Sequence, residues 1–262
     1  MKDITVIIPI HEYNENIKTI LDLAINSVET QENKPKLMMV YSNKIEKEIT
    51  ENYSDKEIIL LKNENKTDFQ SQVNYAVENI DTEYFSILEY DDEYSTTFFK
   101  IANKYINELD KVDIFLPIMI EVNNENQVIK LTNESVWSKQ FVGENGDMGH
   151  LNATALNNYT DFKISGGVIK KDSFIAVNGL KSNIKLAINY EFLLRMLNNG
   201  YSIFTIPKIG YKHISTREGS LFDVYGKTMN QDEKAFWFKT AKNESNFIND
   251  RVIDTSNLTE KK

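Results

Sequence analysis

Residues 84–92, which read Tyr-Phe-Ser-Ile-Leu-Glu-Tyr-Asp-Asp, place a short apolar run directly before an acidic cluster. A continuous apolar run of this length is typical of a strand that is buried on both faces of a sheet. Residues 4–10, Ile-Thr-Val-Ile-Ile-Pro-Ile, form a second run of this kind, and His11 follows it. Each run therefore predicts a buried strand with polar side chains just beyond its carboxyl end.

Apolar residues at helical spacing alternate with these and further strand-like runs. In chain order they predict a helix over 17–28, strands at 37–40 and 58–61, helices over 69–80 and 98–109, and a strand over 112–120. This order predicts the α/β class, with a Rossmann-like, mainly parallel central sheet and flanking helices. Such sheets bind ligands at the carboxyl ends of their strands. We therefore expect four segments to meet at that edge: residues 9–15, 41–43, 62–68 and 89–93.

The second half of the chain is less regular. Residues 121–160 show little periodicity, and residues 123–126 predict a hairpin turn. Within this insertion, Trp137 and the glycines at 143–149 form either a lid or a surface loop. Periodic order then returns, and it predicts a helix over 184–198, strands at 201–206 and 211–214, and an aromatic helix over 236–247.

Composition limits the chemistry of this 262-residue chain. It contains no cysteine, which excludes disulfides, zinc–thiolate sites and cysteine nucleophiles. With three histidines, carboxylates must supply most metal ligands, and this favours Mg²⁺ or Mn²⁺. The net charge of −9 argues against nonspecific binding of nucleic acid, which needs a basic surface.

The chain also lacks the apolar segments that membranes require. No apolar run approaches the ~20 residues that span a bilayer. The N-terminus runs straight into a strand-like segment and has no signal-peptide pattern. We expect a cytoplasmic protein with no stable membrane insertion.

The ordered motifs resemble the inverting family-two glycosyltransferases of GT-A fold, over roughly residues 3–215. The resemblance rests on the opening Val-Ile-Ile-Pro-Ile-His-Glu-Tyr-Asn-Glu-Asn-Ile, and on residues 66–69, 74–77, 82–92, 165–167, 191–195, 200–201 and 213. It implies a GT-A domain over 1–215, with a nucleotide-sugar-binding half at 1–120 and an acceptor half at 121–215. A small C-terminal helical extension over 216–262 would follow.

The resemblance also implies a metal-dependent reaction. The family's acidic motif stands here as Glu89-Tyr90-Asp91, and a late histidine, His213, completes the metal shell. The expected cofactor is Mn²⁺ or Mg²⁺, which stabilises the charge on the leaving diphosphate as a Lewis acid. The alternatives are a solvated acidic turn and a structural histidine.

The nucleotide-sugar donor, expected to be a UDP-sugar, has a pocket implied by the same resemblance. Its predicted residues lie at strand ends and in a glycine pair: Pro9, Ile10, His11, Tyr41, Ser42, Asp68, Tyr90, Gly166 and Gly167. His11 is suited to stack on the base, whereas Tyr41-Ser42 replaces the acidic pair usual in the family. The glycines either let backbone approach the donor sugar or form a bulge.

An inverting transfer needs a general base to deprotonate the acceptor hydroxyl. The family's catalytic Asp falls on Asn189 here, and we predict that Glu191 supplies the base instead. The alternative is an ordinary pairing of Glu191 with Arg195, one helical turn away.

Two other functions compete with this interpretation. A protein that keeps the fold without turnover is favoured by Asn189. A nucleotidyltransferase is disfavoured, because residues 9–17 contain no glycine and only acidic charge. The acceptor stays open among a sugar, a protein, a lipid-linked glycan and a modified base in nucleic acid.

Overall fold

The computed structural model describes residues 2–64, 66–134, 149–156, 160–215, 217 and 220–245. In this part, nine strands form a sheet in the order β3-β2-β1-β4-β8-β6-β9-β5, and β7 pairs with β6 outside this path. The strands are β1 (Ile4–Ile10), β2 (Lys36–Ser42), β3 (Ile59–Asn63), β4 (Tyr84–Ile87), β5 (Glu93–Tyr94), β6 (Ile114–Val122), β7 (Val128–Thr132), β8 (Val168–Lys170) and β9 (Ile203–Ile214). The α-helices are α1 (Glu15–Glu29), α2 (Glu46–Tyr53), α3 (Phe69–Asn79), α4 (Phe98–Glu108), α5 (Ala153–Leu156), α6 (Lys171–Ala176), α7 (Ile188–Asn198), α8 (Leu221–Thr228) and α9 (Gln231–Glu244).

The predicted α/β architecture with a mainly parallel sheet is confirmed. Strands β3, β2, β1 and β4 are parallel neighbours, and β6 is parallel to β9. The short strand β8 runs antiparallel between β4 and β6. The two strands predicted near 201–214 are one strand, β9, whose pairing with β6 shifts register around Ile118.

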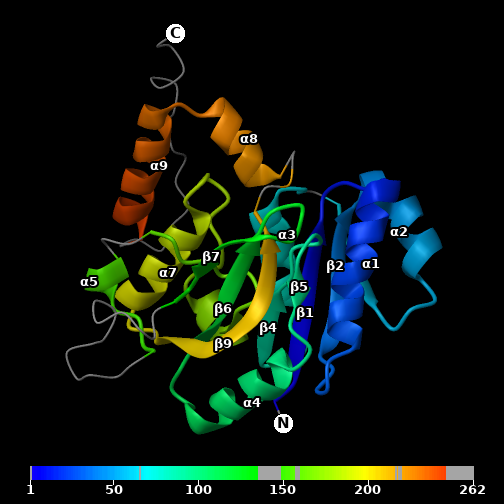
Figure 1. Cartoon of the computed structure of the whole chain (residues 1–262), viewed down its shortest axis with the longest axis horizontal. Coiled ribbons are helices and arrows are strands. Elements are labelled where there is room, and N and C mark those ends of the chain that lie inside the picture. Colours follow the sequence, from blue (N-terminus) through cyan, green and yellow to red (C-terminus); the bar gives the residue numbers. More distant parts are fainter. Residues whose placement is uncertain are drawn as a thin grey trace.

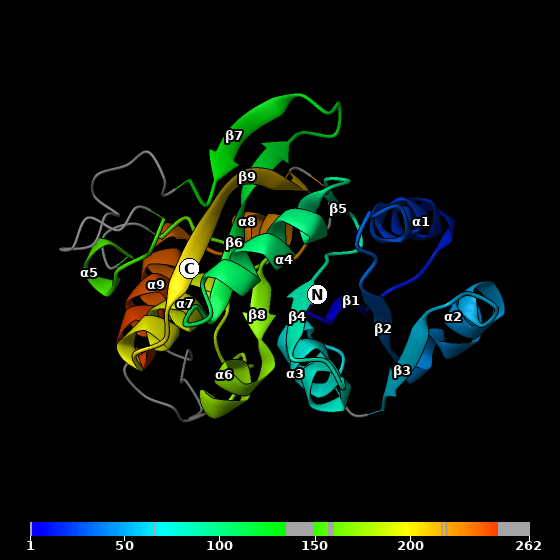
Figure 2. The ribbon, with the colours of Figure 1, turned by 90° about the horizontal axis from the view of Figure 1, so that it is seen from below.

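Helices cover both faces of the sheet and enclose two apolar cores (Figure 2). Helices α1 and α4 lie on one face, where Leu21 and Phe99 are fully buried against residues such as Ile8. Helices α3 and α6 lie on the other face, and α7 extends that core through Phe192 and Leu193. Because both faces are covered, the central strands read as continuous apolar runs in the sequence.

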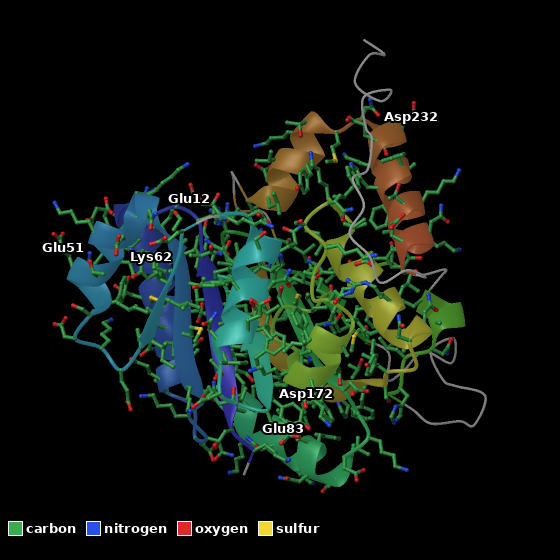
Figure 3. The ribbon with its side chains drawn as sticks, turned by 180° about the vertical axis from the view of Figure 1, so that it is seen from behind. Glu12, Glu51, Lys62, Glu83, Asp172 and Asp232 are labelled. Carbon is green, nitrogen blue, oxygen red and sulfur yellow. The ribbon has the colours of Figure 1, made fainter. Side chains whose placement is uncertain are left out.

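Strands β1, β2 and β4 end at one common edge (Figure 1), which we call the carboxyl edge. Helix α8 lies beyond this edge, whereas α4 lies near the opposite one. Glu12, just after β1, marks the carboxyl edge, and Glu83, just before β4, marks the other (Figure 3). The segments after these strands are thus brought together as the parallel topology predicts.

Among the elements that the sequence analysis did not predict, α2 and β7 were missed because their apolar signal is short. Helix α2 buries only Ile49 and Tyr53, so the pattern lasts a single turn. Strand β7 is exposed at Val128 and Ile129, and it is held by its pairing with β6 across the turn predicted at residues 123–126. Within the described residues, no helix is long and apolar enough to cross a membrane.

The last helix, α9, packs against α7 rather than standing apart (Figure 1). Trp237 is 3% exposed, and Ala241 belongs to the same core as the α7 side chains. The Nζ of Lys181, in the loop before α7, donates to the carbonyl of Glu244 at 3.0 Å. The division of the chain at residue 215 stays a prediction. Helix α9, which follows that position in the sequence, contributes Ala241 to the core shared with α7.

The burial of Trp237 predicts its effect on stability. Trp237→Ala should lower the free energy of unfolding by about 3–5 kcal/mol, since it removes a large buried side chain and leaves a cavity. The exposed Lys239 on the same helix is the control, and Lys239→Ala should change stability by less than about 0.5 kcal/mol. Urea unfolding of both variants measures this. Equal small effects would contradict the docking of α9.

Candidate active site

The turn after β4 is joined to β9 by a buried carboxylate–imidazole pair. Asp92 is fully buried and accepts hydrogen bonds from His213 Nδ1 at 2.9 and 3.1 Å. It also accepts from the backbone N–H of Ile214 at 3.1 Å. Because Nδ1 is engaged by Asp92, the other ring nitrogen of His213, Nε2, is left to bind a ligand.

Burial and charge shift both groups of this pair. Burial raises the pKa of Asp92 to about 6, although His213 opposes the shift. Burial by itself lowers the pKa of His213, but the Asp92 carboxylate outweighs it and raises that pKa to about 9. Without a metal ion, the pair at neutral pH is therefore an imidazolium facing a carboxylate, and Nε2 must lose its proton when it binds a cation.

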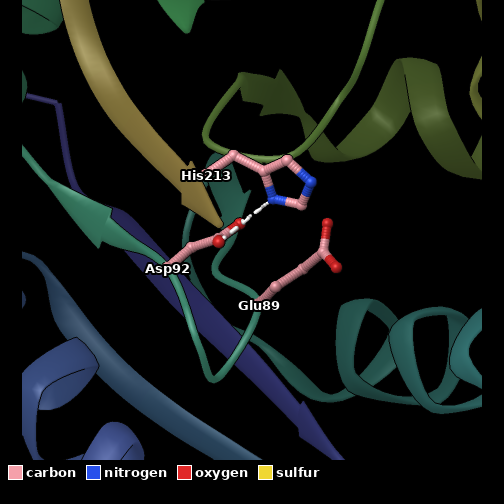
Figure 4. A group of neighbouring side chains, drawn as sticks. All are labelled: Glu89, Asp92 and His213. Atoms are coloured by element: carbon pink, nitrogen blue, oxygen red, sulfur yellow. Dashed lines mark hydrogen bonds and ion pairs between the residues drawn. The ribbon is translucent and has the colours of Figure 1, made fainter. Parts of the chain in front are cut away.

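Glu89 completes a group of three metal-ligating side chains (Figure 4). Ligand atoms of Glu89, Asp92 and His213 all lie within 4.8 Å of one another. Glu89 is positioned by Ser165, whose hydroxyl donates to Oε1 at 2.7 Å, and its backbone N–H donates to the Tyr211 hydroxyl. Two predicted ligands, Glu89 and His213, thus meet at the carboxyl edge.

This donor set fits a divalent cation such as Mn²⁺. An imidazole nitrogen and carboxylate oxygens are ligands that this ion accepts. Asp92 plays the part of the carboxylate that orients a ligating histidine from behind, so its oxygens are directed to Nδ1. The sequence analysis gave Asp92 only a supporting charge, since nothing in one sequence shows that His213 lies opposite it.

Asp91, the third predicted ligand, is not part of this group, although the charges of Glu89 and His213 act on it. It is 8% exposed, and its Oδ2 is 2.5 Å from Nε of Arg217. Burial and the charge of Glu89 raise the pKa of Asp91, against the opposing effect of Arg217. Arg217 was missed by the sequence analysis because it follows the last strand without any periodic pattern.

The predicted donor-pocket residues near β1 are brought together. Pro9 and Ile10 are buried at the end of β1, and His11 is exposed just beyond them. The His11 ring lies 5.6 Å from the ring of Tyr90, whose hydroxyl donates to Glu12 Oε1 at 3.0 Å. The guanidinium of Arg217 lies 4.9 Å from the Tyr90 ring centroid.

Three further predicted pocket residues lie at the end of β2 and just before α3. Tyr41 and Ser42 are 4% and 2% exposed at the end of β2. Asp68 is exposed and caps α3 by accepting from the backbone N–H of Ser71 at 2.9 Å. Asp68 therefore has a structural role that the sequence analysis did not assign to it.

The glycine pair holds the loop before β8 close to the sheet. Gly166 has φ +74°, and a Cβ there would lie 2.3 Å from the Tyr211 ring. Its N–H donates to the carbonyl of Ile87 at 2.8 Å. The close approach places the neighbouring Ser165 against Glu89. A Cβ on Gly167 would lie 2.9 Å from the carbonyl oxygen of Ile164, so it too is packed tightly.

Glu191 is held in a buried ion-pair network. It is 1% exposed, and its two oxygens accept from Arg195 Nε and Nη2 at 2.7 and 2.9 Å. Lys181 Nζ lies 3.4 Å from the same carboxylate. A general base must reach the acceptor hydroxyl. These contacts match the alternative pairing of Glu191 with Arg195, and the role of Glu191 as the general base stays a prediction.

Asn189, two residues earlier, points to another part of the molecule. Its Oδ1 is 3.4 Å from the backbone nitrogen of Ile164, in the loop that carries Ser165. The amide therefore lies beside the loop that positions Glu89. Trp137, Gly143 and Gly146, which were considered for a lid, lie outside the described residues.

Comparisons with known proteins agree with this geometry. The model of the family described as "Glycosyl transferase family 2" matches residues 5–164, which is more than half of the chain. The chain therefore belongs to glycosyl transferase family 2 and is a glycosyltransferase of GT-A fold. A search of curated protein sequences found no match.

The fold is also similar to solved structures of TarS from S. aureus. The structure of TarS 1–349 in complex with UDP-GlcNAc has a TM-score of 0.67 and 14% identity, over 93% of this chain and 66% of that one. TarS 1–349 in complex with UDP has a TM-score of 0.61 and 14% identity, over 93% and 80%. Against the longer TarS structure, the TM-score is 0.60 and the identity 16%, over 86% of this chain and 38% of that one.

The pKa of His213 predicts how the metal-free protein responds to pH. Because the folded state holds the imidazole proton up to about pH 9 and the unfolded chain only to about 6.5, the stabilisation is complete below pH 6.5. It should be lost as pH rises through 9, at a cost of up to ~3 kcal/mol. Thermal unfolding in EDTA between pH 6.5 and 9.5 measures the loss.

The control is the double variant Asp92→Asn/His213→Gln, which keeps polar side chains and removes both charges. Its unfolding free energy should vary less over the same range. An equally steep loss in the double variant would mean that other groups cause it.

Proposed function

We propose that this protein transfers a sugar from a nucleoside-diphosphate donor, a UDP-sugar, to an acceptor hydroxyl with inversion, and that it requires Mn²⁺ or Mg²⁺. The observation that carries the proposal is the group formed by Glu89, Asp92 and His213 at the carboxyl edge. The UDP-GlcNAc complex of TarS, a protein of similar fold, supports a uridine nucleotide as the donor.

The residues that would hold the cation are Glu89, His213 through Nε2, and Asp91. Bound there, a divalent ion supplies Lewis-acid stabilisation of the charge on the leaving diphosphate. Asp92 keeps the His213 ring oriented, and Ser165 keeps the Glu89 carboxylate in place. Their contribution is to hold the ligands ready before the donor arrives.

The donor's nucleoside would lie between the loops after β1 and β2. His11 is exposed and suited to stack on the base, and its ring lies beside the ring of Tyr90. Tyr41 and Ser42 would close the other side, together with Asp68. Gly166 and Gly167 allow the loop with Ser165 to approach the sheet, and this loop would border the donor sugar.

Asn189 makes binding without transfer the second candidate function. An amide does not accept a proton at neutral pH, and the Glu191 carboxylate is enclosed by Arg195 and Lys181. The acceptor is unassigned within the proposal, among the classes that carry a hydroxyl: a sugar, a protein, a lipid-linked glycan or a modified base.

The metal role of Asp91 gives the first test. Asp91→Asn should weaken UDP binding in the presence of Mn²⁺ at least tenfold, or about 1.4 kcal/mol, because a neutral amide is a poorer ligand. Isothermal titration calorimetry with UDP, with Mn²⁺ and with EDTA, measures it. Asp81→Asn is the control, since Asp81 pairs with Lys36 at the opposite edge of the sheet. Equal affinities in all three proteins would remove Asp91 from the site.

Asn189→Asp tests the position of the base. A carboxylate here should raise kcat by about 10²–10⁴-fold, because a general base contributes that much, while UDP affinity stays within about twofold. Release of UDP from UDP-GlcNAc and other UDP-sugars is the assay. Asn189→Ala, which adds no base, should give no increase. Rapid transfer by the unmodified protein would exclude the binding-only alternative.

A further inference from the structure

Arg217 contacts two residues of the proposed site, and one of them, Asp91, is an expected metal ligand. Its Nε contacts Asp91 Oδ2 at 2.5 Å, and its guanidinium lies 4.9 Å from the Tyr90 ring. The two charged side chains are 21% and 7% exposed, so the pair is partly shielded from water. Arg217 therefore covers both the carboxylate expected to bind metal and the aromatic ring beside His11.

Asp91 needs a cation in this environment. It lies next to Glu89 in an acidic turn, and burial disfavours its charge. Within the described part of the chain, Arg217 is the cation recorded in contact with it. A divalent ion that binds Asp91 through Oδ2 would compete with the guanidinium, because Arg217 contacts that oxygen.

The displaced guanidinium has a second partner close by. A donor diphosphate bound to a cation at Glu89, Asp91 and His213 would bring phosphate oxygens to the same place. Guanidinium groups bind phosphate oxygens with paired, charge-assisted hydrogen bonds. Arg217 also lies four residues after His213 in the sequence, so both belong to the same stretch of chain.

Helix α8 extends this cover across the carboxyl edge (Figure 1). It begins at Leu221, shortly after Arg217, and carries Tyr225. The pKa of Tyr225 is raised by burial and by the charge of Asp68, at the start of α3. Arg217 thus lies near Asp91, and Tyr225 lies near Asp68, and both carboxylates are assigned to the site.

We propose that Arg217 pairs with Asp91 and neutralises it until the divalent cation binds. When the cation binds Asp91, the guanidinium moves to the donor diphosphate. This exchange rests on the proposed function, since it assumes a metal–diphosphate ligand. It would keep the acidic turn neutralised before the donor binds, and it couples donor binding to a movement of the Arg217 side chain.

The exchange predicts that one substitution raises the affinity for Mn²⁺ and lowers the affinity for UDP. In Arg217→Gln the competitor for Asp91 is gone, so Mn²⁺ alone should bind about five- to tenfold more tightly. UDP should bind at least tenfold more weakly at saturating Mn²⁺, because a phosphate ligand is lost. Calorimetry with the full chain gives both values. A residue with a purely structural role would weaken both affinities, and a simple phosphate ligand would leave the Mn²⁺ affinity unchanged.

Two further variants sharpen the test. Lys212→Gln removes a nearby charge that pairs with Glu93 instead of Asp91, so both affinities should stay within about twofold. Arg217→Lys keeps the charge but not the paired geometry, so Mn²⁺ affinity should stay near that of the unmodified protein while UDP affinity falls.

The outcomes separate the two proposals. An unchanged or lower Mn²⁺ affinity in Arg217→Gln overturns the exchange, even where UDP binds as expected. Undiminished UDP affinity in that variant also overturns it. If the unmodified protein binds Mn²⁺ but no UDP, the proposed function fails at its donor, and the exchange fails with it because its second partner is absent.

Discussion

The contact between Asp92 and His213 determines how the rest of the site is arranged. It joins the turn after β4 to β9. In the sheet, β8 and β6 lie between β4 and β9. A fully buried carboxylate is stable only with strong partners, and here the imidazole and the Ile214 N–H supply them. The pair orients the His213 ring, and Glu89 is then held opposite it by Ser165. The tight packing of Gly166 on Tyr211 makes that last contact geometrically feasible.

A second buried network carries the other half of the molecule. Arg195 is fully buried, and it binds Glu191 and the carbonyls of Val177 and Gly179. Together with Lys181 it ties α7 to the preceding loop and to the end of α9. Removing one partner of such a network leaves an uncompensated buried charge, which is strongly destabilising. The network therefore fixes α7, and with it the position of Asn189 beside the loop that carries Ser165.

These two networks use similar residue types for different ends. Glu191 and Arg195 lie one helical turn apart and satisfy each other inside the protein. Asp91 and Arg217 form a pair at the carboxyl edge, beside Tyr90 and Glu89 of the proposed site. Glu191 and Arg195 lie away from the proposed donor site. In the proposed exchange, a cation would compete with Arg217 for Asp91, and a diphosphate would compete with Asp91 for Arg217. Location in the fold, rather than residue type, separates a structural pair from an exchangeable one.

The sequence by itself determined the order of the main strands and helices, the parallel topology and the edge at which the polar segments meet. Buried central strands and amphipathic helices leave strong local patterns, and parallel crossovers then dictate which strand ends coincide. It also predicted Glu89 and His213 as metal ligands, and the structure brings these two side chains together, whereas their role stays a prediction. Only the tertiary structure decided that Asp92 orients His213, that Arg217 covers Asp91 and that Glu191 is enclosed by cations. These facts depend on contacts between residues more than 100 positions apart or, for Glu191, on which face of its helix is buried, and local periodicity does not encode them.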